Sequence, residues 1–257
     1  EGMRWMWSLG DYSLLAEALE PHAEALANAC EIRPGATVLD VAAGNGNFAL
    51  AAARLGATVT ATDLTPHMVE LGRARTAGVG AITWSEADAE QLPFADSTFD
   101  VVASVFGAMF APRPQLVASE MFRVARPGGL VAMANYSPGG YLGRMSDLMA
   151  TFSAHPAYEL PSPFAWGDED ELRRRFSGHA SSIVVRHRTL YFESDSVESF
   201  VEFWERTNAP LAALKSMLPA ESYQDVLAQQ KELVGGLNEA SDGGVKLGSP
   251  YILVLAT

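Results

Sequence analysis

The sequence is poor in cysteine and in basic residues. Its 257 residues contain one cysteine, Cys30, which excludes an internal disulfide framework and an all-cysteine metal site. Cys30 is expected to be a small buried residue near the end of the first helix, and no metal site is expected. The chain has 18 Lys and Arg against 31 Asp and Glu, a net charge of −13, and its one basic run is "RRR" at 173–175. A nucleic-acid partner is therefore disfavoured.

Long apolar runs and targeting patterns are also absent. No apolar run reaches the ~18 residues that indicate a membrane span, and nothing near the start has the regions of a secretory signal. We therefore expect no membrane partner and a cytoplasmic location. The composition, 48% apolar and 19% charged, is typical of a globular protein, and the length favours one large domain, 1–257, that carries insertions.

Short β-rich runs alternate with helical patterns in the first half of the chain. Strands are expected at 37–41, 58–62, 81–87, 100–106 and 130–136. One helix is expected to begin at Pro66 and to stop near Gly78, and another spans about 114–123 with Val117, Met121 and Val124 on its buried side. This alternation is typical of βαβ units and predicts an α/β fold with a doubly wound, mainly parallel sheet.

The second half follows a different pattern. Strands are expected at 182–193 and 251–256, and about 55 residues of mostly helical pattern lie between them. A segment rich in Pro, Met and aromatic residues, 137–167, is expected to be irregular. Together with a helix from about 12 to 30, these insertions are the candidate lid over a ligand site.

The stretch "VLDVAAGNGNFALAAA" at 38–53 predicts a ligand-binding loop. Gly44 and Gly46 follow the first strand and open a helix, so backbone N–H groups and the positive helix end face a ligand with negative groups. With Ala49 the spacing also matches the dinucleotide form G-x-G-x-x-A, and Asp63 ends the second strand, where a ribose-binding acid belongs. The loop alone therefore fits either a nicotinamide dinucleotide or another nucleotide-like cofactor.

Asp40 helps to separate these alternatives. A carboxylate at the tip of the first strand would repel a pyrophosphate but would favour ammonium or sulfonium charge, and S-adenosylmethionine carries both. Asp63 would then bind the ribose hydroxyls through its two acceptor oxygens. Asp88 follows the third strand at the carboxyl edge of the sheet, where it can accept a hydrogen bond from an adenine amino group, and the small Ala89 beside it admits a flat base.

Four ordered motifs carry a family resemblance. "VLDVAAGNG", "TATD" ending in Asp63, "EADAEQLPFADSTFDVV" and "RVARPGGLVAMAN" resemble the successive signatures of class I S-adenosylmethionine-dependent methyltransferases, in particular the ubiquinone and menaquinone biosynthesis branch. The resemblance spans about 32–136. One departure is Ala42, which stands where the family usually has a first glycine.

The resemblance implies a Rossmann-like, seven-stranded, mainly parallel sheet with an antiparallel last strand and helical lid insertions. The expected organisation is a lid helix in 1–31, a cofactor-binding core in 32–136, and substrate-cap insertions at 137–180 and 194–248. The implied cofactor is S-adenosylmethionine, which becomes S-adenosylhomocysteine. The residues expected to bind it are Tyr12, Asp40, Ala42, Gly44, Asn45, Gly46, Asp63, Leu64, Met68, Asp88, Ala89, Ser104 and Val105.

The acceptor site and the catalytic groups are less constrained by the sequence. Large apolar side chains predict an acceptor pocket formed by Phe106, Met109, Phe110, Tyr141 and Trp166. Methyl transfer depends above all on alignment and requires no catalytic side chain, so none is assigned. If the acceptor needs a base, His155 and Tyr136 are the candidates, whereas His67 is expected at the surface.

The leading hypothesis is a methyltransferase that acts on an O, N or C atom of a small organic molecule, for instance in secondary metabolism. One alternative is an NAD(P)-dependent oxidoreductase, against which Asp40 and the absence of a Tyr-x-x-x-Lys pattern argue. Another is a non-catalytic S-adenosylmethionine-binding protein, which binding without turnover would support. Pairing of the insertion helices between two copies would give a homodimer, which no spacing in the sequence tests.

Overall fold

The computed structural model describes residues 2–152, 160–241 and 243–257, and these form two compact units. Unit 1 comprises the described residues of Glu1–Ala18, Tyr136–Glu159 and Thr189–Pro250. Unit 2 comprises Leu19–Asn135, Leu160–Arg188 and Tyr251–Thr257. Boundaries fall inside one helix and three long strands, each of which contributes residues to both units. The expected division into lid, core and caps at other residues stays a prediction.

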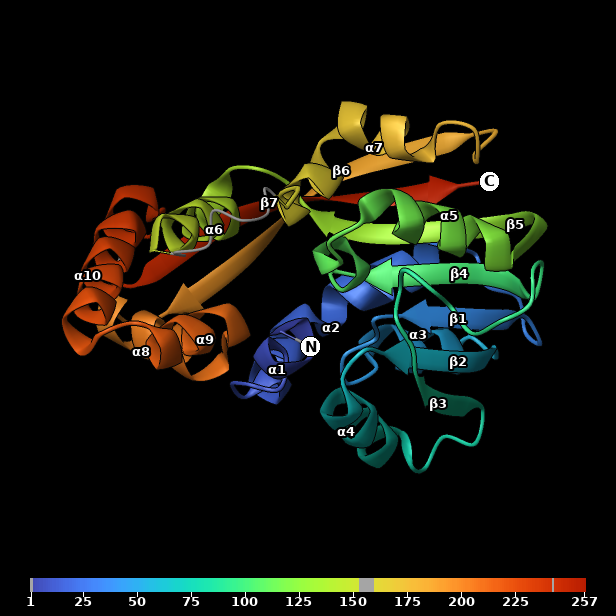
Figure 1. Ribbon diagram of the computed structural model, residues 1–257, viewed down its shortest axis with the longest axis horizontal. Coiled ribbons are helices and arrows are strands. Elements are labelled where there is room, and N and C mark those ends of the chain that lie inside the picture. The colour runs from blue at the N-terminus through green and yellow to red at the C-terminus, as the bar shows by residue number, and fades with distance from the viewer. Residues whose placement is uncertain (1, 153–159, 242) are drawn as a thin grey trace. The chain divides into compact units, whose positions relative to one another are not determined.

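The strands form one seven-stranded sheet in the order β3-β2-β1-β4-β5-β7-β6 (Figure 1). They are β1 (Thr37–Val41), β2 (Thr58–Asp63), β3 (Ile82–Glu86), β4 (Phe99–Val105), β5 (Ala125–Tyr136), β6 (Ile183–Ser194) and β7 (Val245–Ala256). Strands β1 to β5 pair in parallel. Ser182 and Thr257 exchange backbone hydrogen bonds, as expected where β7 runs antiparallel to β6. The predicted seven-stranded sheet with an antiparallel last strand is confirmed.

The central strands are apolar because both faces of the sheet are covered. Val38, Leu39 and Val41 of β1 are buried, and β4 is buried along most of its length. Such continuous apolar runs are typical of parallel strands between two helical layers. Asp40 is the polar residue among the four buried positions of β1, and it pairs in register with Ala61 of β2 and Ala103 of β4.

Helices α3 (Asn47–Arg54) and α4 (Pro66–Thr76) connect β1 to β2 and β2 to β3, whereas α5 (Pro114–Val124) connects β4 to β5. Because the first two connections run in one direction along the sheet and the third runs in the other, right-handed crossovers place α5 on the opposite face. As predicted, the buried side of α5 carries Val117, Met121 and Val124. Helix α7 (Glu169–Phe176) packs against α5.

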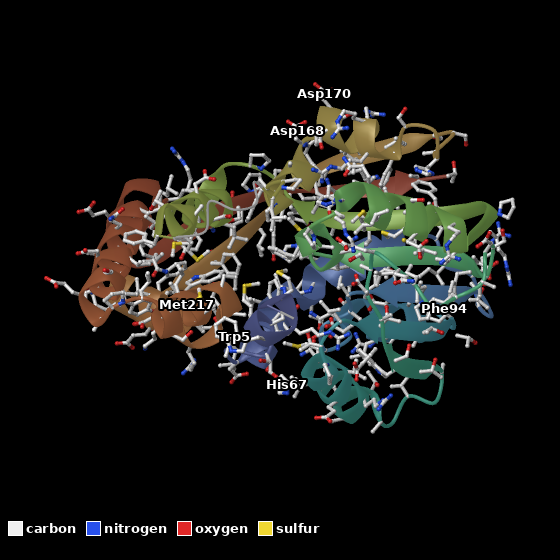
Figure 2. All side chains as sticks on the ribbon, in the orientation of Figure 1. Trp5, His67, Phe94, Asp168, Asp170 and Met217 are labelled. Atoms are coloured by element: carbon white, nitrogen blue, oxygen red, sulfur yellow. The ribbon has the colours of Figure 1, made fainter. Side chains whose placement is uncertain are left out.

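The basic run at 173–175 belongs to α7 and is paired internally. Asp168 caps this helix by accepting a hydrogen bond from the Glu171 N–H at 2.9 Å (Figure 2). Arg173 pairs with Glu169, and Arg174 pairs with Glu171, each at 2.7 Å. These pairs, with acids in the first turn and bases in the last, complement the helix dipole.

Unit 1 is mainly helical. Its helices are α1 (Gly2–Met6), the beginning of α2 (Tyr12–Ala29), α6 (Gly140–Phe152), α8 (Val197–Thr207), α9 (Ala209–Met217) and α10 (Ala220–Leu237). Its interior is aromatic, because the buried ring of Tyr141 contacts Phe200 and Trp204 of α8. None of the helices in the described parts of the chain has the length and apolarity needed to cross a lipid bilayer.

The structure corrects some expectations about these elements. The segment 137–167, expected to be irregular, contains α6 and the short 3-10 helix η2 (Pro163–Gly167). Helix α6 forms despite its glycines because Tyr141 and Met145 are buried where it packs against α10. Strand β7 also begins at Val245, before the expected 251, and β5 begins at Ala125.

Cys30 directly follows α2 and is buried, as predicted. Burial raises the pKa of its thiol to about 12, because the apolar interior disfavours the thiolate. A thiol in this state is a packing residue and a poor nucleophile.

The contact between α4 and β3 depends on a glycine. The Trp84 indole lies directly against Gly72, and its Nε1 donates to Thr76 Oγ1 at 2.9 Å. A methyl group at position 72 would overlap the indole ring. Because the hydrogen bond and burial fix the ring, it cannot move aside without losing contacts.

We expect Gly72→Ala to lower the free energy of unfolding by about 1–3 kcal/mol, although alanine is the better helix former. Urea unfolding followed by circular dichroism measures the change. Gly78→Ala is the control, because nothing lies within 4 Å of a Cβ at that position, and its effect should stay within about 0.5 kcal/mol. A stabilised Gly72→Ala protein would contradict the packing argument.

Candidate functional site

The loop between β1 and α3 has an unusual backbone. Ala42, Gly44 and Gly46 all have positive φ angles, of 54°, 56° and 91°. Glycine adopts this region without strain, and a Cβ at Gly46 would also lie 2.8 Å from the Trp84 ring. Ala42 adopts it at a cost of about 1–2 kcal/mol. The departure from the family pattern at position 42 therefore leaves a left-handed conformation in place.

Asp63 fixes the middle of the loop. One of its carboxylate oxygens accepts a hydrogen bond from the Gly44 N–H at 2.9 Å, and the other accepts one from the Thr65 N–H at 3.0 Å. The side chain is buried, and burial raises its pKa. Each carboxylate oxygen can accept a second hydrogen bond, so Asp63 can hold the loop and still accept from a ligand hydroxyl.

Asp40 lies behind the same loop and is 1% exposed. Its Oδ2 accepts a hydrogen bond from the Ala49 N–H at 3.0 Å, in the first turn of α3. Its buried Oδ1 has no hydrogen-bond partner among the residues that the structure describes. Burial, reinforced by the negative charge of Asp63, raises the pKa of Asp40 to about 8. A cation placed near this carboxyl group would stabilise its charged form.

The other predicted cofactor residues of unit 2 lie around this centre. Ala87, just before Asp88, donates its N–H to the Asp63 carbonyl at 3.0 Å, and the Asp88 side chain accepts from the Glu90 N–H at 2.9 Å. Ser104 donates to the Val41 carbonyl at 2.7 Å and so joins the ends of β4 and β1. Leu64 is half-buried, whereas Met68 and Ala89 are buried.

Tyr12 is the exception among the predicted cofactor residues. It begins α2 within unit 1, and its contact with the cofactor stays a prediction.

The predicted acceptor residues divide between the two units. In unit 2, Phe106 has a positive φ of 54°, and η1 (Ala108–Phe110), which carries Met109 and Phe110, contacts η2, which carries Trp166. The Trp166 ring packs against the Arg175 guanidinium at 4.6 Å. In unit 1, Tyr141 is fully buried and its hydroxyl accepts a hydrogen bond from Gln230 at 2.8 Å. Tyr141 thus stabilises a helical interior, and its contact with an acceptor stays a prediction.

Of the candidate bases, His155 lies outside the described residues, and Tyr136 ends β5 as a buried residue of unit 1. His67 lies at the exposed surface of α4 (Figure 2). His22 received no role from the sequence, but its Nδ1 lies 2.8 Å from the Tyr251 hydroxyl, and its ring approaches Phe106. Burial lowers the pKa of His22 and favours the neutral ring, which can accept a proton. No local pattern joins residues 22 and 251.

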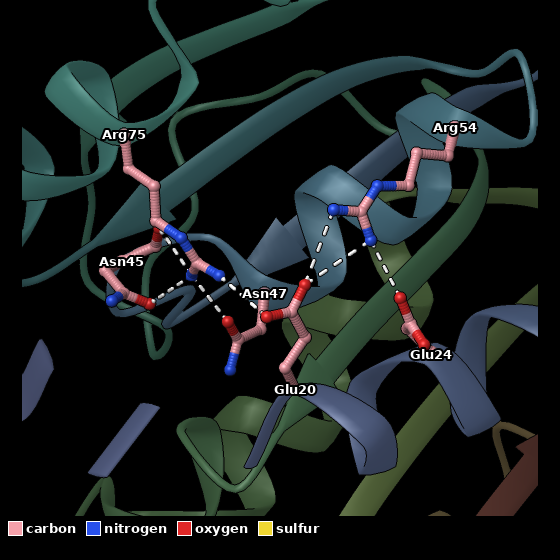
Figure 3. Close-up of polar contacts among 6 residues, drawn as sticks. All are labelled: Glu20, Glu24, Asn45, Asn47, Arg54 and Arg75. Atoms are coloured by element: carbon pink, nitrogen blue, oxygen red, sulfur yellow. Dashed lines mark hydrogen bonds and ion pairs between the residues drawn. The ribbon is translucent and has the colours of Figure 1, made fainter. Parts of the chain in front are cut away.

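Arg75 is a second residue near the loop that the sequence patterns did not identify. Its guanidinium donates to the side chains of Asn45 and Asn47 at the tip of the glycine loop (Figure 3). Arg75 follows Asn45 by 30 residues, so only the folded chain brings the two together.

Comparisons with known proteins agree with this geometry. A family model described as a methyltransferase domain matches residues 39–133. An uncharacterized protein of Mycobacterium tuberculosis is 42% identical over 189 residues, which are 73% of this chain and 69% of that protein. The demethylmenaquinone methyltransferase of Clavibacter sepedonicus is 36% identical over 172 residues, which cover 61% of this chain and 69% of that enzyme.

The fold has relatives among solved structures as well. The crystal structure of the YcgJ protein of Bacillus subtilis matches with a TM-score of 0.65 and 20% sequence identity. The match covers 91% of this chain and 97% of that chain.

The raised pKa of Asp40 predicts a pH-dependent stability. Its value of about 8 in the folded protein exceeds the ordinary 3.8, so between these values the folded chain binds the proton more tightly than the unfolded chain. The stability that the protonated group contributes is complete below about pH 4 and is lost as the pH rises to about 8. Asparagine cannot titrate.

We therefore expect the free energy of unfolding of the wild type, minus that of Asp40→Asn, to fall as the pH rises from about 4 to 8. The slope should approach about 1.4 kcal/mol per pH unit within this window. Urea unfolding of both proteins at several pH values measures the difference. A difference that is independent of pH would show that Asp40 titrates normally.

Proposed function

The chain belongs to the class I S-adenosylmethionine-dependent methyltransferases, and from this premise we propose that it transfers the methyl group of this cofactor to an O, N or C atom of a small organic molecule. The observation that carries the proposal is the pair of buried carboxyl groups, Asp40 and Asp63, at a glycine loop that opens a helix. The similarity to the demethylmenaquinone methyltransferase of Clavibacter sepedonicus supports a small organic acceptor.

The residues around the loop fit S-adenosylmethionine. The unpartnered Oδ1 of Asp40 suits a ligand that brings ammonium and sulfonium charge, because ionised Asp40 is otherwise disfavoured by burial. The free acceptor capacity of Asp63 suits the two ribose hydroxyls. Asp88, on the exposed turn after β3, suits the adenine amino group, with Leu64 and Ala89 as apolar neighbours.

In methyl transfer the main contribution of the protein is to orient the cofactor and the acceptor relative to each other. When bound, S-adenosylmethionine supplies a methyl group on a positively charged sulfur, which an acceptor lone pair displaces in line with the departing sulfur. The loop and the two carboxyl groups would hold the methionine and ribose ends, and Phe106 and Met109 would bound the acceptor side. Alignment of this kind supplies up to ~7–11 kcal/mol in well-oriented systems.

Both alternatives remain testable beside this proposal. An NAD(P)-dependent oxidoreductase would place a pyrophosphate at the loop, near a carboxyl group that is 1% exposed and adjacent to a second acid. A pyrophosphate would add negative charge beside acids whose ionised forms burial already disfavours, and this electrostatic cost disfavours that function. A non-catalytic S-adenosylmethionine-binding protein would use the same residues and differ only in lacking turnover.

Parallel calorimetric titrations with S-adenosylmethionine, S-adenosylhomocysteine, NAD and NADP decide between the cofactors. We expect the first two to bind with micromolar dissociation constants, and neither nicotinamide nucleotide to bind. An acceptor screen with methyl-labelled cofactor then separates the enzyme from the non-catalytic binder. Binding of NAD or NADP alone would overturn the proposal.

Asp63→Ala should weaken the binding of S-adenosylhomocysteine at least about tenfold, because the ribose loses its acceptors and Gly44 loses the hydrogen bond that holds it. Isothermal titration calorimetry measures the change. Asp96→Ala is the matched control, because this acid is highly exposed and pairs with Arg123 away from the loop. Equal affinities of the two variants would remove Asp63 from the site.

A further inference from the structure

We propose that Arg75 is a positioning residue for the cofactor: its guanidinium holds the glycine loop in the conformation that binds S-adenosylmethionine. This inference rests on the proposed function, since it concerns the same loop. Arg75 lies in the last turn of α4, outside the motifs that carry the family resemblance.

Arg75 contacts Asn45 of the loop and Asn47, the first residue of α3. Its Nη1 donates to the Asn45 side-chain oxygen at 2.8 Å and to the Asn47 side-chain oxygen at 2.5 Å. The carbonyl oxygen of Asn45 lies 3.5 Å from the same nitrogen. One cationic nitrogen thus joins the residues on either side of Gly46 (Figure 3).

The two asparagines are buried, with exposures of 6% and 8%, and Arg75 is partly covered. Hydrogen bonds to a charged donor are stronger than neutral ones, and burial makes their loss costly because the amide oxygens cannot turn to water freely. Arg75 therefore restrains the loop more firmly than a solvent-exposed pair of the same length would.

A glutamate on α2 holds the arginine in turn. Arg75 Nη2 lies 3.4 Å from Glu20, which also lies 3.4 Å from Arg54 of α3. Arg54 makes its shorter contact, of 2.7 Å, with Glu24 (Figure 3). Of the two arginines in this cluster, Arg75 contacts Asn45 and Asn47, whereas the contacts of Arg54 among the described residues are with Glu20 and Glu24.

The three restraints on the loop are different in kind. Asp63 holds the Gly44 N–H, the Trp84 ring limits the space at Gly46, and Arg75 holds the residues before and after Gly46. Asp63 ends β2 and Trp84 lies within β3, whereas Arg75 comes from the far end of α4. Without Arg75, the residues around Gly46 would sample other conformations, and binding would have to order them.

The test compares Arg75→Met with Arg54→Met. Methionine keeps much of the aliphatic bulk but cannot donate to Asn45, Asn47 or Glu20. We expect Arg75→Met to raise the dissociation constant of S-adenosylhomocysteine about tenfold. Arg54→Met, which removes a cation from the same cluster without touching the loop, should leave it within about twofold. Calorimetry is done well below the unfolding midpoint of each variant.

Two further measurements separate positioning from general stability. Arg75→Lys, which retains a cationic donor, should recover at least half of the lost binding free energy. In a double-mutant cycle with Asn47→Ala, the losses from Arg75→Met and Asn47→Ala should not add, because each removes the same hydrogen bond. A purely structural role predicts additive losses and equal effects of the Arg75 and Arg54 substitutions.

The outcomes are distinguishable from failure of the proposed function. If the wild type binds neither S-adenosylmethionine nor S-adenosylhomocysteine, the proposed function is wrong, and the inference falls with it. If the wild type binds and folded Arg75→Met binds as tightly, the inference alone is overturned. If Arg75→Met does not fold, the same decision rests on Asn47→Ala, which is expected to weaken binding by about fivefold.

Discussion

The carboxyl edge of the sheet is organised by two buried acids that cannot both be charged without help. Asp40 accepts the Ala49 N–H, and Asp63 accepts the N–H groups of Gly44 and Thr65. These hydrogen bonds fix the beginning of α3, the glycine loop and the beginning of α4 relative to one another. The same burial raises both pKa values, because it disfavours the charged forms, and a cationic ligand would favour them. The loop is therefore shaped by the groups that a sulfonium ligand would stabilise.

Sequence patterns predicted the sheet because its strands and connecting helices are each determined by residues close together in the sequence. Buried parallel strands require apolar runs such as 37–41 and 100–106. The connecting helices are indicated by Pro66 at a helix start, by Gly78 after a helix end and by the spacing of apolar residues. Helix α6 could not be predicted in this way, because its sequence contains Gly140 and Gly143, which are poor helix formers. Its stability comes from Tyr141, whose hydroxyl accepts a hydrogen bond from Gln230, 89 residues later. A contact of that range leaves no local pattern.

The candidate site, like the fold, has residues that local sequence patterns predict and residues that only the folded chain brings together. The sequence identifies four candidate residues because each lies at the end of a predicted strand or just after it: Asp40, Gly44, Gly46 and Asp63. At these positions the backbone turn and the charge of a ligand limit which residue types fit. The residues that hold this centre in place could not be found. Arg75 meets Asn45 across 30 residues, and His22 meets Tyr251 across 229, so both contacts depend on the packing of whole elements. The candidate ligand-binding residues lie near the ends of strands, whereas the residues that hold them in place come from elements far apart in the sequence.

Ala42 shows how neighbouring residues hold the glycine loop in its conformation. An alanine at φ 54° is strained where glycine would not be, yet the loop keeps the left-handed conformation. Its neighbour across the site is Gly107, where a Cβ would overlap the Ala42 carbonyl oxygen and lie 2.8 Å from the Ala42 methyl group. The lack of a side chain at Gly107 leaves room for both the carbonyl oxygen and the methyl group of Ala42. The left-handed conformation at Ala42 is thus accommodated by the missing Cβ of Gly107 and by hydrogen bonds of the next two residues, from the Ala43 N–H to the Thr62 carbonyl and from the Gly44 N–H to Asp63. These contacts explain why one departure from the motif leaves the loop intact.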